Sequence, residues 1–324
     1  MSLLKSQPIF KPFNYTWAYN AWKKQQQIHL LPEEVSLADD VHDWKYNLTD
    51  NERSLLTQIF RFFTQADIEV NNCYIKNYLR IFEPTEIKMM LVSFSNAETI
   101  HIDAYSHLLD TIGMPEIEYK AFNKYKQMKD KYDYMQKFNV NSNFEIAKTL
   151  AVFGAFTEGI QLFASFVMLL NFPRFGKMKG MGQIITWSIR DETLHTLSII
   201  KLFKTFISEN PNILNSSLKK TIYNCCRHIV IHEDAFIDLA FSFNKNTISG
   251  MNSNDIKSYI RFIANRRLIQ LGLLPIYNIK NNPLPWVDIV LNVPEHVNFF
   301  ENKVTEYSKS ATSGSWEDAF RFFH

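Results

Sequence analysis

Two Glu-x-x-His motifs inside apolar helical stripes constrain this chain more than any other feature. The motifs are Glu98–His101 and Glu192–His195, and no other glutamate precedes a histidine by three residues. On an α-helix, side chains three residues apart project from one face. Each motif shares its face with apolar neighbours and is therefore expected to point into the core. Charged side chains are rarely buried there unless they are paired or bind metal.

The apolar spacing of the rest of the chain predicts an all-α fold. From about residue 48 to residue 204, apolar residues return every three or four positions, and residues 218–244 and 253–271 show the pattern of two more amphipathic helices. Period-two alternation is scarce, and 9 glycines and 11 prolines are too few for an all-β sandwich. Helix breaks are expected at Pro84, 113–115, 139–143, 173–182 and 210–215.

Charge and composition exclude several classes of protein. The chain has 35 Lys+Arg and 33 Asp+Glu among 324 residues, which gives a net charge of +2 and no reason to expect nucleic acid as a partner. Its three cysteines form neither a disulfide framework nor a zinc motif. The longest apolar stretch, 160–172, falls short of the roughly 18–20 residues that cross a membrane. We therefore expect a cytoplasmic protein with no membrane partner.

Two more predicted helices each carry an acid within the apolar stripe. Asp67 follows Phe63 by four residues, and Glu158 precedes Leu162 by four. Four carboxylates and two histidines on four helices form the ligand set of ferritin-like dinuclear metal bundles. Two divalent ions carry four positive charges, which four carboxylates neutralise in a dry core. Carboxylate-rich sites of this kind suit iron or manganese.

A tyrosine and a further acid are expected next to the metals. Tyr105 lies four residues after His101, on the same helix face. A phenol beside an oxidising metal pair is placed to lose an electron and a proton. Leu162 and Phe166 are expected to line an apolar pocket around it, which would keep water from a radical. Asp191 is a candidate to hold a ligand imidazole by a hydrogen bond.

With these residues in place, the chain resembles the small, radical-generating beta subunit of class I ribonucleotide reductase along nearly its whole length. Ferritins and desaturases share the metal motif but lack the tyrosine spacing and the last matching stretch. The stretches that carry the resemblance are 31–35 (Leu-Pro-Glu-Glu-Val), Asp67, Glu98 to Tyr105, Glu158, Arg190 to His195 and 282–286 (Asn-Pro-Leu-Pro-Trp).

The resemblance implies a role for each matching residue. Glu98 and Glu192 would bridge the metals, Tyr105 would carry the stable radical, and Asp191 would lie on the radical-transfer path. An iron pair is favoured, while manganese–iron and dimanganese pairs remain open because the ligand types are the same. The expected ligands form two sets: Asp67, Glu98 and His101 for one metal, and Glu158, Glu192 and His195 for the other.

The resemblance also implies a partner. The subunit would activate O2, oxidise Tyr105 and pass the oxidising equivalent to a cysteine of a large subunit, where a ribonucleoside diphosphate or triphosphate becomes the deoxy form. It would be a homodimer whose tail docks on that partner, with Tyr307 as relay tyrosine and 316–320 as docking contacts. The expected parts are an irregular N-terminal arm (1–28), a ferritin-like helical domain (29–304) and a flexible tail (305–324).

One position departs from the family pattern. Two residues before the Pro-Glu-Glu segment the family usually has a tryptophan, which delivers an electron during cofactor assembly; here the residue is Leu30. Leucine cannot be oxidised, so this step needs another aromatic residue, such as Trp22 or Trp44, or the step is impaired.

Three alternatives remain open from the sequence. An iron-storage ferroxidase would have no use for Tyr105 or a docking tail. A stand-alone oxidase on the same fold would hold its own apolar substrate in the bundle. A purely structural helical bundle would leave the acids in the apolar stripes unexplained.

Overall fold

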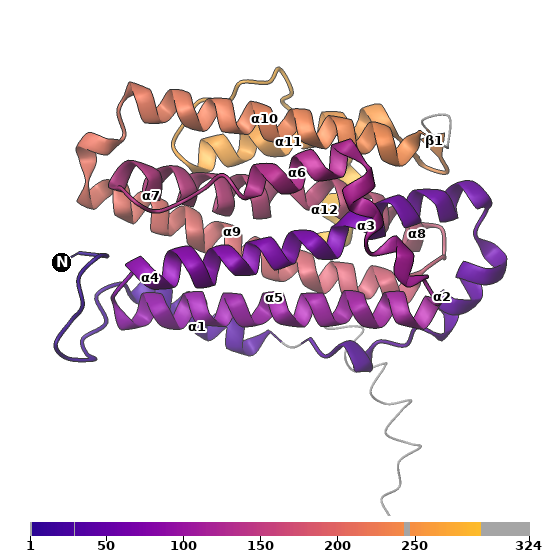
Figure 1. Cartoon of the computed structure of the whole chain (residues 1–324), viewed down its shortest axis with the longest axis horizontal. Coiled ribbons are helices and arrows are strands. Elements are labelled where there is room, and N and C mark those ends of the chain that lie inside the picture. The colour runs from indigo at the N-terminus through magenta and orange to yellow at the C-terminus, as the bar shows by residue number, and fades with distance from the viewer. Residues whose placement is uncertain (1, 29, 243–246, 293–324) are drawn as a thin grey trace, which may run out of the picture. The chain divides into compact units, whose positions relative to one another are not determined.

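The computed structural model describes residues 2–28, 30–242 and 247–292, and these residues are almost entirely helical (Figure 1). This confirms the all-α prediction. The only strands among the described residues are β1 (Thr247–Ile248) and β2 (Met251–Asn252), which pair antiparallel. The helices are α1 (Thr16–Gln27), α2 (Ala38–His42), α3 (Asp50–Cys73), α4 (Leu79–Ile81), α5 (Thr85–Ile112), α6 (Lys126–Met135), α7 (Asn143–Leu150), α8 (Phe163–Arg174), α9 (Lys179–Glu209), α10 (Ser216–Phe241), α11 (Ser253–Gln270) and α12 (Pro285–Asn292).

The chain divides into two compact units, Met1–Leu284 and Pro285–His324. The first unit holds every helix from α1 to α11. Helix α12 is the described part of the second unit. The predicted tail, 305–324, lies outside the described residues.

Helices end at the predicted breaks, for identifiable local reasons. Pro84 precedes the first residue of α5, and that helix ends at Gly113, whose φ of 76° is the left-handed conformation of a helix C-terminus. Asn215 caps α10, because its side chain accepts hydrogen bonds from the backbone N–H groups of Ser217 and Leu218.

The expectation that residues 1–28 form an irregular arm is wrong for residues 16–27. These residues form α1, which packs against α5. Its buried stripe consists of Ala18, Ala21 and Gln25. Two small residues and a glutamine give little hydrophobic contrast, so the helical period is hard to see among the surrounding aromatic and polar residues.

Four elements form the core that matters for function. Helix α3 packs against α5, and α9 packs against both α5 and the segment η6 (Ala151–Gln161). Segment η6 is π-helical and joins α7 to α8 in one run, Asn143–Arg174. The 32 residues of that run have the length and composition of a membrane span, yet its most apolar window is completely buried within the fold.

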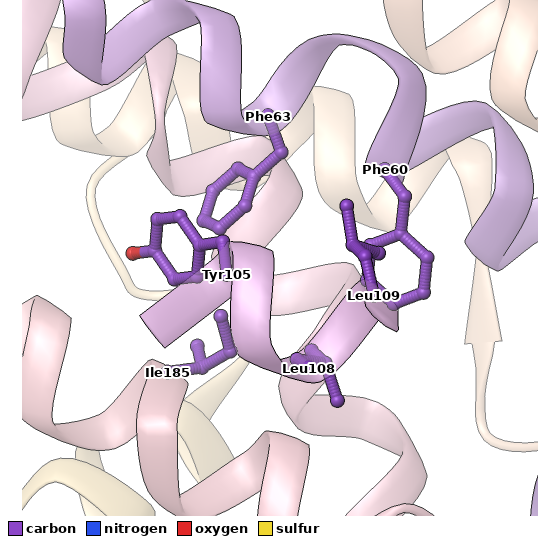
Figure 2. Close-up of a pocket in the computed structure, with 6 residues that line it drawn as sticks. All are labelled: Phe60, Phe63, Tyr105, Leu108, Leu109 and Ile185. Atoms are coloured by element: carbon purple, nitrogen blue, oxygen red, sulfur yellow. The ribbon is translucent and has the colours of Figure 1, made fainter. Parts of the chain in front are cut away.

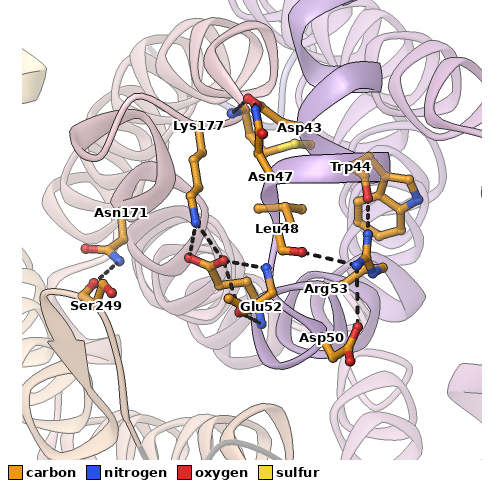
Figure 3. A network of polar contacts seen from close by, with 12 residues as sticks. Asp43, Trp44, Asn47, Leu48, Asp50, Glu52, Arg53, Asn171, Lys177 and Ser249 are labelled. Carbon is orange, nitrogen blue, oxygen red and sulfur yellow. Dashed lines mark hydrogen bonds and ion pairs between the residues drawn. The ribbon is translucent and has the colours of Figure 1, made fainter.

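A polar network joins the start of α3 to the segment that leads into α9 (Figure 3). Thr49 and Glu52 form a capping box at the start of α3. Lys177 Nζ lies 2.8 Å from both carboxylate oxygens of Glu52. The backbone N–H of Met178 donates to Asp43 Oδ2 at 2.7 Å. These contacts fix where α3 and α9, two of the core helices, begin relative to each other.

Candidate metal centre

The structure brings all six predicted ligands together in the core of the bundle. They come from four elements: α3, α5, the π-helical segment η6 and α9. Each of them is at most 2 % exposed. The six residues are Asp67, Glu98, His101, Glu158, Glu192 and His195.

Two groups of these side chains are close enough to share an ion. In each group, the candidate donor atoms lie within 4.8 Å of one another. The first group is Asp67, Glu98 and His101, and the second is Glu98, Glu158 and His195. Glu98 belongs to both, which is the position expected of a bridging carboxylate.

The two Glu-x-x-His motifs cross over one another. Glu98 Oε1 lies 3.0 Å from Nδ1 of His195, the histidine of the other motif. In return, Glu192 Oε1 lies 3.3 Å from Nδ1 of His101. Each glutamate therefore lies close to the imidazole of the other motif, although the sequence assigned Glu192 to the set of His195.

Most donor atoms that face this site make no hydrogen bond of ordinary geometry, although some, such as Glu98 Oε1 and His195 Nδ1, lie close to one another. Buried polar atoms in proteins are nearly always paired, so each exception requires an explanation. The unpartnered atoms of the six residues are Asp67 Oδ2, both carboxylate oxygens of Glu98 and Glu192, Glu158 Oε2, and Nδ1 of His101 and His195. Oxygen and imidazole nitrogen donors converging in this number fit two divalent cations.

The buried carboxylates of this site repel one another. Burial and the charge of Glu98 raise the pKa of Asp67 well above its usual range. Burial and the charges of Glu192 and Glu98 do the same to the pKa of Glu158. Burial and Glu98 raise the pKa of Glu192 to about 7. Although burial raises it, the neighbouring imidazoles of His101 and His195 bring the pKa of Glu98 down to about 2. Cations would relieve this repulsion.

The far side of each imidazole is held by a hydrogen-bonding group. His101 Nε2 lies 3.1 Å from Asp191 Oδ2, as the sequence predicted. Burial acts to lower the pKa of His101, but the carboxylates of Asp191, Glu192 and Glu98 outweigh it and raise that pKa well above its usual range. His195 Nε2 lies 3.2 Å from Oε1 of Gln25 on α1. With the proton on Nε2, both imidazoles present a free Nδ1 lone pair to the site.

Tyr105 lies beside the His101 end of the site, with 6.3 Å between the two ring centroids. Its Oη donates to Ser188 Oγ at 2.7 Å. The cavity beside it is about 10 Å³, at the lower limit for one water molecule (Figure 2). Burial and the nearby Asp67 hold the pKa of Tyr105 well above its usual range. The residues lining the cavity are Phe60, Phe63, Tyr105, Leu108, Leu109 and Ile185.

The prediction that Leu162 and Phe166 line this cavity is wrong, since neither is among those residues. Phe166 lies one ring further out, with its centroid 5.4 Å from that of Phe63. Phe63 itself lies 4.6 Å from the Tyr105 ring. The π-helical segment that precedes α8 changes the rotation of the chain after Glu158, which a regular helical count does not include.

A second buried tyrosine touches the site and was not singled out from the sequence. The Oη of Tyr74 donates to Glu158 Oε1 at 2.5 Å. Its ring meets that of His195 edge to face, with centroids 6.3 Å apart. Tyr74 begins the π-helical segment η3 (Tyr74–Tyr78). The one sequence signal is its place seven residues after Asp67, two turns along the same face.

The tryptophans suggested as substitutes for position 30 occupy different surroundings. Leu30 is buried. The ring of Trp22 packs against Tyr19 at 5.6 Å. The ring of Trp44 lies 6.3 Å from Phe60, which lines the Tyr105 cavity. Of the two, Trp44 is the one whose ring packs against a residue that lines the Tyr105 cavity.

The proposed tail contacts lie outside the described residues. They are Tyr307 and the segment 316–320.

Comparison with known proteins agrees with this geometry. Residues 9–283 match the family model for the ribonucleotide reductase small chain. The chain is 45% identical to the probable ribonucleoside-diphosphate reductase small subunit of invertebrate iridescent virus 6, over 98% of each chain. It is 29% identical to the ribonucleoside-diphosphate reductase subunit beta of Chlamydia pneumoniae, over 94% of this chain and 91% of that one.

A solved structure shows the same fold. The ribonucleotide reductase R2 subunit from Clostridium botulinum superimposes with a TM-score of 0.79 at 26% identity, covering 86% of this chain and 89% of that chain. The all-α bundle is thus the ferritin-like fold of these subunits. The chain belongs to the ribonucleotide reductase small-chain family.

Proposed function

We propose that this chain generates and stores a tyrosyl radical on Tyr105 for the reduction of ribonucleoside diphosphates by a large subunit. The observation that carries the proposal is the set of unpartnered, buried oxygen and nitrogen atoms that converge from four elements. They lie next to a phenol in an apolar cavity. The large-subunit partner and the reduction of ribonucleotides are inferred from membership of the ribonucleotide reductase small-chain family.

In this proposal, one metal ion is held by Asp67, Glu98 and His101, and the second by Glu158, His195 and the shared glutamates. When bound, the metal pair supplies the oxidising power for Tyr105 by reducing O2. An iron pair is favoured by the resemblance, and manganese–iron or dimanganese pairs use the same ligands.

The surrounding residues orient the ligand imidazoles and protect the Tyr105 ring. Asp191 and Gln25 hold the two imidazoles by Nε2, so that each Nδ1 faces the metals. Ser188 accepts the hydrogen of the phenol and fixes the Tyr105 ring. Apolar walls leave no room for more than one water beside the ring, so a radical there is shielded from quenching. Asp191 is also proposed to lie on the path by which the oxidising equivalent leaves.

The cavity argues against the stand-alone oxidase. Such an enzyme needs space for an organic substrate, which takes several hundred Å³. The cavity beside Tyr105 is about 10 Å³. A ferroxidase would have no use for a phenol enclosed in this way.

The proposal includes an assembly. A homodimer docks on the large subunit through the C-terminal tail, with Tyr307 as relay tyrosine, in the cytoplasm. Removing the residues after Val304 should abolish binding to the large subunit and leave the radical intact. Tight binding by the shortened chain would contradict the tail assignment.

The test uses the whole chain loaded with Fe(II) without oxygen and then exposed to O2. Once the reaction is complete, low-temperature EPR should show a stable tyrosyl signal that Tyr105→Phe abolishes while metal content is unchanged. Mixed with the large subunit, the wild-type chain should form deoxynucleotides and Tyr105→Phe should not. Tyr78→Phe is the matched control, since Tyr78 is an equally buried tyrosine whose hydroxyl donates to a backbone carbonyl. A full radical signal in Tyr105→Phe would overturn the proposal.

A further inference from the structure

Each histidine of the metal site lies beside one buried tyrosine. The ring centroid of Tyr105 lies 6.3 Å from that of His101, and the ring centroid of Tyr74 lies 6.3 Å from that of His195. Both phenols are buried, with 3 % and 1 % of their surfaces exposed. The proposed function uses only Tyr105.

The two phenols differ in what accepts their hydrogen. Tyr105 donates to Ser188, a neutral hydroxyl that cannot keep a proton. Tyr74 donates to Oε1 of Glu158 at 2.5 Å. The other carboxylate oxygen, Oε2, is the unpartnered one that faces the metal site. Glu158 thus offers one oxygen to a cation and the other to the phenol of Tyr74.

The reduction of O2 leaves one electron without an assigned donor. O2 requires four electrons and four protons to become two molecules of water. Two ferrous ions supply two electrons as they become ferric, and Tyr105 supplies one. Leu30 has no oxidisable side chain. A fourth electron must therefore come from another group near the metals, or from a reductant in solution.

We infer that Tyr74 supplies this electron, an inference that rests on the proposed function. Tyr74 loses one electron to the O2-derived oxidant and its hydroxyl proton to Oε1 of Glu158, and becomes a phenoxyl radical. Glu158 passes this proton on to the reduced oxygen. Tyr105 loses its electron and proton in the same overall reaction, and two further protons are taken up from solvent. O2, two Fe(II), two phenols and two H+ thus become two water molecules, two Fe(III) and two phenoxyl radicals. A further Fe(II) ion from solution then returns Tyr74 to the phenol, with uptake of one proton.

The surroundings favour Tyr74 over the other aromatic residues. An electron and a proton that leave together create no net charge on the ring, which matters in a core where an isolated charge is costly. Tyr78, 5.9 Å from Tyr74 between ring centroids, donates to the backbone carbonyl of Thr149, which does not take up a proton. Trp44 lies at the Tyr105 side, beyond Phe60.

The test is freeze-quench EPR on the full chain, loaded with two Fe(II) per chain and mixed with O2. Tyr105→Phe should still give a short-lived tyrosyl signal. Tyr105→Phe/Tyr74→Phe should lose that signal, and the matched double variant Tyr105→Phe/Tyr78→Phe should keep it. Metal content and circular dichroism on the same samples show whether each variant is folded and loaded.

Wild-type protein gives a measurement that does not depend on any variant folding. With iron limiting, the early tyrosyl spin count should reach twice that of the final Tyr105 radical, and excess Fe(II) should remove the second spin. A loaded Tyr105→Phe chain with no tyrosyl signal, a signal that survives in the Tyr74 double variant, or an early count that never exceeds the final one would overturn the inference. Loss of the Tyr105 signal in wild-type protein would instead contradict the proposed function.

Discussion

Two clusters of buried charge in the first unit are built on opposite principles. At the metal centre, four carboxylates meet two imidazoles. Between α6 and α10, Lys131 Nζ lies 2.6 Å from Glu233 Oε1, with the two side chains 1 % and 0 % exposed. The rings of Phe62 and Phe236 also lie against this ammonium group, at 4.9 and 4.4 Å from their centroids.

The difference shows which cluster needs positive charge from outside the chain. Burial lowers the pKa of Lys131, and burial raises the pKa of Glu233 to about 7. Whichever of the two holds the shared proton, the pair has no net charge. At the metal centre, the carboxylates face two imidazoles, and the acids repel one another. Bound cations would balance the negative charge of these carboxylates, as Lys131 balances that of Glu233.

The largest effect is expected when a shared ligand is removed. Glu98→Ala should lower metal affinity by at least about 100-fold, because it takes one donor from each of the two ligand groups. Metal analysis after dialysis should find little metal, and the radical should be absent. The matched change at the Lys131–Glu233 pair (the neutral cluster), Glu233→Gln, should leave metal content unchanged. Equal metal loss in both variants would mean that the two clusters are not distinct.

At the neutral cluster, the largest effect is on stability. Lys131→Met leaves Glu233 buried without its cation and should lower the free energy of unfolding by about 3–5 kcal/mol. Replacing both residues, as Lys131→Met/Glu233→Leu, should recover most of that loss because no charge stays buried. Urea unfolding of the metal-free protein measures both variants. A double variant no more stable than the single one would show that the pair contributes more than charge balance.

The pH dependence of stability should separate metal-free from metal-loaded protein. Glu192 has a folded pKa of about 7, above the usual value of about 4.3 in an unfolded chain. Between these values the folded state binds more protons, so the stability of the metal-free protein should fall as pH rises from about 4.3 to 7, by about 4 kcal/mol from this residue.

Bound metal takes the place of that proton, so the loaded protein should not show this fall. Glu233 titrates in the same pH range in both forms and cancels in the comparison. Metal-free Glu192→Gln is the control and should show a smaller pH dependence. Parallel pH profiles for loaded and metal-free wild-type protein would argue against metal at Glu192.

The smallest effect is expected at the hydrogen bond of the radical tyrosine. Ser188→Ala removes the acceptor of the Tyr105 hydroxyl and should cost about 1 kcal/mol of stability. The radical should still form, with a shift in its high-field EPR g-values because the hydrogen bond is gone. Ser198→Ala, a buried serine on the same helix, is the control and should leave the spectrum unchanged. An unshifted spectrum in Ser188→Ala would show that the hydroxyl does not bond the radical.

Much of the helical framework and the converging site could be predicted from the sequence. Glu98 and His101 are three residues apart, and the apolar stripes of their helices determine which way they face. A local rule therefore suffices to bring each pair to the core. Asp67 and Glu158 could be added because a lone acid in an apolar stripe is conspicuous.

Apart from Asp191, the supporting residues could not be predicted, for a physical reason. Gln25 meets His195 across 170 positions of sequence, and Tyr74 meets Glu158 across 84. Ser188 meets Tyr105 across 83. Serine, glutamine and tyrosine are ordinary in helices, and only tertiary packing selects which of them reaches a ligand. The π-helical segment η6 also shifts side chains away from the positions that a regular helix gives.

The most direct test of the two-metal site is X-ray anomalous scattering from crystals grown with Fe(II) or Mn(II). Two peaks are expected, one among Asp67, Glu98 and His101 and one among Glu98, Glu158 and His195, with none at Glu233. A core with no peak at these ligands, or metal bound at Glu233 instead, would contradict this expectation.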